Sequence, residues 1–94
     1  MSAVQAKAEF DDLMVVSKQA NLVSSYDFSE TGRVIYVTDL WYELEVPFKK
    51  DFLAKVARLQ DTVTGSHRFE VRNVRSNETV AEVTAFSGSL EVYR

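Results

Sequence analysis

The chain has no cysteine, one proline and three glycines among its 94 residues. Without cysteine it can form neither disulfide bonds nor thiolate metal sites. Its apolar fraction of 46% and charged fraction of 27% are those of an ordinary folded protein rather than a disordered one. A chain of this length buries only about 60 to 65% of its unfolded surface, so it needs one efficient core. We therefore expect a single domain over residues 1–94.

Long apolar runs are also missing. Glu9, Asp11 and Asp12 interrupt the amino-terminal segment where a signal peptide needs an apolar stretch. No other run approaches the length that crosses a membrane. The sequence therefore predicts a cytoplasmic protein with no membrane partner.

Basic side chains are scarce in the first half of the chain. Residues 1–46 carry three basic and eight acidic side chains, and residues 47–94 carry eight basic and six acidic, which together give the net charge of −3. Nonspecific nucleic-acid binding depends on clustered lysine and arginine, so we expect no nucleic-acid partner. The asymmetry favours contacts between the two halves, or between copies of the chain.

The spacing of apolar residues predicts two helices. The first covers residues 3–20, with Ser2 as a plausible N-cap and Asn21 as a stop. The second starts at Pro47, which suits the first position of a helix, and ends before Gly65, which suits a left-handed cap. Its apolar stripe comprises Phe48, Phe52, Val56, Leu59 and Val63.

The stretch 33–46 alternates strictly, which is typical of a strand. Fourteen residues would span roughly 45 Å, whereas a domain of this size has a radius of gyration of about 12 to 13 Å. We therefore expect a bent strand, with the bend at Thr38–Asp39; a hairpin there is the alternative. The row predicted to face the core is Val34, Tyr36, Thr38, Leu40, Tyr42, Leu44 and Val46. The row predicted to face water or a partner is Arg33, Ile35, Val37, Asp39, Trp41, Glu43 and Glu45.

Shorter alternating stretches predict further strands at 22–28, 67–72, 79–86 and 90–93, with a bend at residues 87–89. Apolar faces on the sheet and the helices must be buried against each other. The predicted fold is therefore α+β: a single domain with a curved antiparallel sheet of four to six strands and two helices packed on one face. The predicted order is helix-strand-strand-helix-strand-strand.

No side chain carries a clear catalytic signal. His67 titrates near neutrality, but its alternation with apolar residues indicates a half-buried strand histidine. Glu43 and Glu45 share a strand face at the separation of paired catalytic carboxylates. Arg68 and Arg72 have the same spacing, so cross-strand ion pairs explain the two glutamates more simply. We therefore assign no catalytic residue, metal ligand or cofactor, and expect no enzymatic activity.

Trp41 is the more informative residue. It shares its row with Ile35 and Val37, and contiguous exposed apolar surface usually marks an interface, where tryptophan is enriched. The first hypothesis is a small cytoplasmic protein–protein interaction or self-assembling module, a homodimer or larger, whose partner-binding surface comprises Ile35, Val37 and Trp41.

The alternative is a small-molecule-binding domain or small enzyme with a cavity between the curved sheet and the helices. Its predicted ligand-binding residues are Tyr26, Tyr36, Tyr42 and His67. Buried tyrosine hydroxyls need hydrogen-bond partners. If they converge on one polar cavity, the ligand hypothesis gains; if they reach water, it fails.

Overall fold

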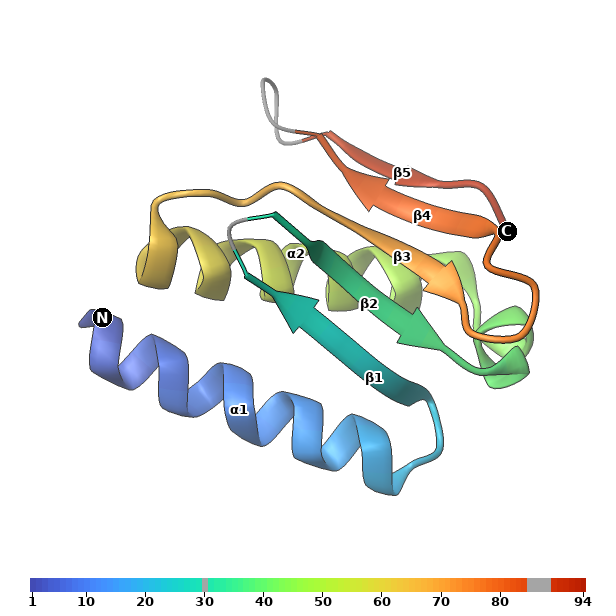
Figure 1. Cartoon of the computed structure of the whole chain (residues 1–94), viewed down its shortest axis with the longest axis horizontal. Helices are drawn as coiled ribbons and strands as arrows, with labels where there is room; N and C mark the ends of the chain where they lie inside the picture. Colours follow the sequence, from blue (N-terminus) through green and yellow to red (C-terminus); the bar gives the residue numbers. More distant parts are fainter. Residues whose placement is uncertain (30, 85–88) are drawn as a thin grey trace.

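The computed structural model describes residues 1–29, 31–84 and 89–94. In these ranges the chain forms two α-helices, one short 3-10 helix and five strands (Figure 1). Their bounds are α1 (Ala3–Gln19), β1 (Val23–Phe28), β2 (Arg33–Val37), η1 (Asp39–Glu43), α2 (Val46–Thr64), β3 (Phe69–Asn73), β4 (Thr79–Val83) and β5 (Leu90–Val92). The last residues of the strand predicted over 79–86, and the bend predicted at 87–89 except Ser89, lie outside the described residues.

The strands form one sheet in the order β1-β2-β3-β4-β5. Neighbours pair antiparallel except β2 and β3, which are parallel. The α+β class with two helices is confirmed, whereas the prediction of a purely antiparallel sheet is wrong. A parallel pair needs a long crossover connection, and α2 supplies it by carrying the chain from the end of β2 back to the level where β2 starts.

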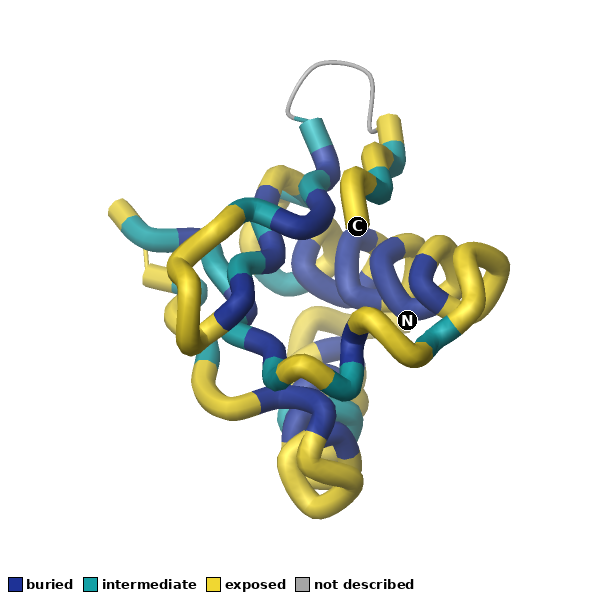
Figure 2. The backbone as a smooth tube through the Cα atoms, turned by 90° about the vertical axis from the view of Figure 1, so that its right-hand side faces the viewer, coloured by how far each residue is buried: buried dark blue, intermediate teal, exposed yellow. Residues whose placement is uncertain are grey.

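Both helices cover one face of the sheet and contact each other (Figures 1 and 2). Helix α1 packs against β1, and α2 packs against β4 and β5. The buried stretches of α2 and of the strands face each other in Figure 2, which places the core between these two layers. Its fully buried large side chains include Trp41, Phe69, Met14, Ile35, Leu53, Leu59 and Val71.

Strand β2 faces the opposite way from the prediction. Arg33, Ile35 and Val37 are buried, whereas Val34 and Tyr36 are only half-buried on the face without helices. Both rows of β2 are apolar, so alternation established a strand here but could not decide which row faces the helices. The predicted assignment of the two rows is therefore wrong.

The stretch 33–46 is neither a bent strand nor a hairpin. Strand β2 ends at Val37, and the hydroxyl of Thr38 accepts a hydrogen bond from the Leu40 N–H at 3.2 Å, which starts the turn of η1. The same hydroxyl donates to the Asn21 carbonyl at 2.6 Å. Thr38 thus ends the strand at the predicted bend, and the later alternation belongs to a 3-10 turn and the entry to α2.

The turn of η1 directs Trp41 into the core. Its side chain is 0% exposed, its indole Nε1 donates to the Arg94 carbonyl at 3.0 Å, and its ring packs edge-on against Phe52. Ile35 and Val37 are also 0% exposed. The prediction that these three residues form an exposed partner surface is therefore wrong, because the sheet row and the turn both point toward the helices.

Lys49 is a cation buried beside this tryptophan. Its Nζ donates to the Arg94 carbonyl at 2.9 Å and lies 5.4 Å from the centre of the Trp41 ring. Among the described residues no aspartate or glutamate side chain pairs with it. Burial lowers the pKa of the Lys49 ammonium, because desolvation disfavours the charged form.

The predicted helix ends agree with the structure to within one residue, because α1 ends at Gln19 rather than at residue 20 and α2 starts at Val46 rather than at Pro47. Ser2 caps α1 by accepting from the Gln5 N–H, and the Gln5 side chain accepts from the Ser2 N–H in return. Helix α2 ends at Gly65, whose φ of 77° is left-handed and whose N–H donates to the Asp61 carbonyl at 2.8 Å. These local signals fix where both helices begin and where α2 ends. In the described part of the chain, no helix is both long and apolar enough to cross a bilayer.

Replacing Gly65 by valine should lower the free energy of unfolding by about 1 to 2 kcal/mol, because a β-branched residue is strained at positive φ. No atom lies within 4 Å of the position that a Cβ would take at this glycine, so steric overlap does not contribute. Urea unfolding measures the change. Gly65→Asn is the control and should cost less, because asparagine tolerates the left-handed region. Equal stability of the two variants would show that backbone strain is not the cause.

Candidate functional site

The structure does not bring the four predicted ligand residues together. Tyr26 pairs with Ile35 across the sheet and faces the helices, so Tyr36 lies on the opposite face. Tyr42 is exposed in η1, and His67 follows the end of α2. The predicted cavity shared by these side chains is therefore not formed by them.

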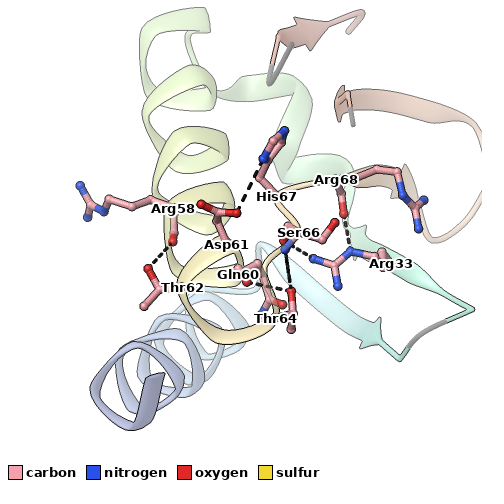
Figure 3. Close-up of polar contacts among 9 residues, drawn as sticks. All are labelled: Arg33, Arg58, Gln60, Asp61, Thr62, Thr64, Ser66, His67 and Arg68. Atoms are coloured by element: carbon pink, nitrogen blue, oxygen red, sulfur yellow. Dashed lines mark hydrogen bonds and ion pairs between the residues drawn. The ribbon is translucent and has the colours of Figure 1, made fainter. Parts of the chain in front are cut away.

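A different set of polar side chains gathers where α2 ends and β2 starts (Figure 3). Arg33, the first residue of β2, is 8% exposed. Its Nε donates to the Arg68 carbonyl at 2.5 Å, and its Nη2 donates to the Ser66 carbonyl at 2.7 Å. Its guanidinium lies 5.4 Å from the centre of the Phe28 ring. The guanidinium is thus held in one orientation by two carbonyls and an aromatic face.

The left-handed turn after α2 positions these carbonyls. Gly65 reverses the chain, so that residues 66–68 run back beside the start of β2. The Thr64 hydroxyl donates to the Gln60 carbonyl at 2.8 Å and accepts from the Ser66 N–H at 3.2 Å. These bonds fix the segment in which two carbonyls hold Arg33.

The positive charges of Arg33 and Arg68 are not balanced by ion pairs with described residues. Among the described residues no carboxylate pairs with Arg33 or with Arg68. Burial lowers the pKa of Arg33, and the positive charge of Arg68 lowers it further. Both effects disfavour the charged form of Arg33, although arginine stays protonated in proteins. An anion near the two guanidinium groups would relieve both effects.

A hollow of about 360 Å³ opens beside the two arginines. We call it the arginine hollow, and it is bordered by Phe28, Arg33, Thr64, Ser66 and Arg68. No carboxylate lies among these residues. Its lining therefore combines two cations, two hydroxyl groups and one aromatic ring.

A neighbouring hollow of about 420 Å³, at the ends of the strands, shares Arg33 and Arg68. Glu70 and Glu82 also border it. The Glu70 carboxylate is bound by Arg72 at 2.7 Å, and the Glu82 carboxylate accepts from the Tyr93 hydroxyl. That hydrogen bond raises the pKa of Tyr93 to about 12. Both carboxylates thus have partners of their own.

A third hollow, of about 330 Å³, lies between α1, α2 and β1. We call it the aromatic hollow, and it is bordered by Lys7, Phe10, Asp11, Tyr26, Phe28, Gln60, Val63 and Thr64. Phe28 and Thr64 also border the arginine hollow. The two hollows therefore lie side by side at one end of the molecule.

His67 is half-buried, as predicted, but it lies in the connection before β3 rather than in a strand. Its Nδ1 is 3.9 Å from an Asp61 oxygen, which is too long for a hydrogen bond. Its Nε2 is buried without a hydrogen-bond partner. Glu43 and Glu45 are exposed outside the sheet, and their predicted ion pairs with Arg68 and Arg72 do not form.

The role of Arg33 is not evident from the sequence. Arg33 belongs to the row predicted to face water or a partner, together with Ile35 and Val37. Once that row is assigned to the core, an arginine at its start is the feature that signals a site, because arginine is rarely buried without a partner. Arg68 carried no separate signal, because its position beside Arg33 depends on the turn after α2.

Comparison of the chain with protein-family models, with curated proteins and with solved structures gave no significant match. Among the described residues, no group of three or more histidine, aspartate or glutamate side chains is placed to hold a metal ion. The site is therefore interpreted from its own geometry.

Proposed function

We propose that the chain is a small-molecule-binding module without catalytic activity, and that its ligand places an anionic group in the arginine hollow. The observation that carries this proposal is the buried guanidinium of Arg33, which has no carboxylate partner among the described residues. Burying a cation without a counterion is costly. A bound carboxylate or phosphate would supply the missing charge.

The geometry suits an anion. Nε and Nη2 of Arg33 are held by carbonyls, which leaves Nη1 without a hydrogen-bond partner among the described residues. Charge-assisted hydrogen bonds from arginine to carboxylate or phosphate are among the strongest in proteins. Arg68 is exposed at the rim and adds a second charge, and the Ser66 hydroxyl adds a donor. The anion would thus meet one buried, oriented cation and one exposed cation.

Titration of the ¹⁵N-labelled chain with sodium phosphate, and separately with sodium acetate, tests this proposal, with sodium chloride at equal ionic strength as the reference. We expect saturable shifts of the amides of Ser66, His67 and Arg68 with at least one of the two anions. Arg68→Gln should weaken binding about tenfold, because it removes a charge-assisted hydrogen bond. Arg33 is not substituted, because its two hydrogen bonds join β2 to the segment after α2.

Arg58→Gln is the matched control. Arg58 is exposed on α2, and its guanidinium points away from Arg33 and Arg68 in Figure 3. The Arg58→Gln substitution removes the same charge from the same end of the molecule. It should therefore leave the affinity for the anion unchanged, apart from a small long-range effect that salt screens. Linear shifts without saturation for both anions, or equal affinities of the two variants, would refute the proposal.

Protein contact is the second candidate function, because three large apolar side chains are exposed close together in the chain. Tyr42, Val46 and Phe48 are 41%, 49% and 51% exposed. This is a different surface from the one predicted, and we propose that it mediates any self-association of the chain. Light scattering of the native chain and of Phe48→Ser tests this. A monomer in both cases would refute self-association through this surface.

A further inference from the structure

Gln60 is the most unusual polar side chain beside the aromatic hollow. It lies on α2 and is 3% exposed. Its Oε1 is buried without a hydrogen-bond partner, and no described residue hydrogen-bonds its side-chain amide. Buried polar groups in folded proteins are almost always paired, so an unpaired carboxamide at the border of a hollow calls for an explanation.

The rest of the aromatic hollow suits a flat ring. The Phe10 and Phe28 rings are 5.0 Å apart at 80°, and the Phe10 and Tyr26 rings are 5.6 Å apart at 89°. Aromatic groups favour edge-to-face and offset contacts of this kind, so a planar ligand ring can join such a cluster. Lys7 and Asp11 pair with each other at 3.0 Å on the exposed side of α1. The polar groups that remain for a ligand are therefore the Gln60 carboxamide and the Tyr26 hydroxyl.

The two hollows are close enough for one small molecule. Phe28 and Thr64 border both, and the Thr64 hydroxyl is hydrogen-bonded to the Gln60 carbonyl one helical turn away. Arg33 lies over the Phe28 ring from the side of the arginine hollow. A ligand with its anionic group at the arginines can thus reach past Phe28 into the aromatic hollow.

We infer that the ligand is an anion that carries a heteroaromatic ring, which is the chemistry of a nucleoside monophosphate. This inference rests on the proposed anion site. The phosphate occupies the arginine hollow, and the base lies in the aromatic hollow against Phe10 and Phe28. A carboxamide offers both a donor and an acceptor and can rotate to present either, which matches the edge of a nucleobase. An aliphatic acid would leave Gln60 unpaired, and inorganic phosphate would fill only one hollow.

Three probes test the inference by NMR titration: adenosine monophosphate, adenosine and inorganic phosphate. We expect adenosine monophosphate to bind about tenfold or more tightly than phosphate, because stacking of a base on aromatic side chains adds affinity. Gln60→Leu should weaken the binding of adenosine monophosphate about three- to tenfold, which is the range for one lost hydrogen bond, and should leave the affinity for phosphate unchanged. Gln19→Leu, on the exposed end of α1, is the matched control and should change neither affinity.

The outcomes separate the inference from the proposal on which it rests. If phosphate saturates but adenosine monophosphate binds no more tightly, and Gln60→Leu has no effect, the inference is wrong and the anion site stands. If adenosine monophosphate and phosphate both fail to saturate, the inference is wrong, and the anion site stands only if acetate saturates. Should Gln60→Leu fail to fold, intermolecular nuclear Overhauser effects from the base protons to the rings of Phe10 and Phe28 decide the question in the native chain. Their absence at saturation would overturn the inference.

Discussion

Replacing Trp41 by alanine is expected to lower the free energy of unfolding by about 3 to 5 kcal/mol and to leave the mass of the native protein unchanged. Trp41 is fully buried within one chain, so its removal leaves a cavity in the core rather than a gap in an interface. It also removes the hydrogen bond from the indole to the Arg94 carbonyl and the ring contact with Phe52. Urea unfolding followed by circular dichroism measures the first effect, and light scattering measures the second.

Tyr42→Ala is the control for this experiment. Tyr42 is the next residue in η1 and is exposed, so its truncation should change the free energy of unfolding by about 0.5 kcal/mol or less. A lower native mass for Trp41→Ala with unchanged stability would mean that Trp41 contacts another chain. Equal effects of the two substitutions would contradict the orientation of the η1 turn.

The helices could be predicted from the sequence because their signals are local. The capping box of Ser2 and Gln5, the proline at the start of α2 and the left-handed Gly65 act within a few residues. The three-and-four spacing of apolar side chains then predicted α1, whose buried residues are Ala6, Phe10, Met14 and Ser17. Each of these signals is independent of how the rest of the chain folds.

The stretch 33–46 could not be predicted in the same way, because contacts from far along the chain decide it. Asp39 accepts hydrogen bonds from the side chains of Asn73 and Arg75, each at 2.8 Å, and these bonds hold its pKa below the ordinary value. The Thr38 hydroxyl donates a hydrogen bond to the Asn21 carbonyl. These partners, 17 to 36 residues away, stabilise a turn where the alternation of Leu40, Tyr42 and Leu44 imitates a strand.

The candidate site could not be predicted from the sequence for the same reason. Strand β2 presents an apolar row on each face, so the sequence did not reveal that Arg33 points toward the helices. The carbonyls that hold Arg33 belong to Ser66 and Arg68. Every residue has a backbone carbonyl, so the sequence does not single these two out. Tyr26 and Phe28 were placed correctly in a strand, but the hollow that they border also needs Gln60 from α2. The geometry of the site therefore emerges only when β1, β2 and the end of α2 meet.

Phe52→Ala should lower the free energy of unfolding by about 3 to 5 kcal/mol, whereas Phe48→Ala should change it by about 0.5 kcal/mol or less. The two phenylalanines lie one turn apart on the same apolar stripe of α2, so the sequence alone gives them equal weight. In the structure Phe52 is buried against the edge of the Trp41 ring, at 6.3 Å between ring centres, and Phe48 is 51% exposed in the first turn of the helix.

The difference between the two variants measures burial alone, because residue type, helix and substitution are the same. Urea unfolding followed by the fluorescence of Trp41, the only tryptophan, reports both variants. If Phe48→Ala is as costly as Phe52→Ala, the start of α2 is covered in the native protein, and the exposed surface of Tyr42, Val46 and Phe48 is then buried by a partner. If neither substitution is costly, α2 does not pack on the sheet through this stripe.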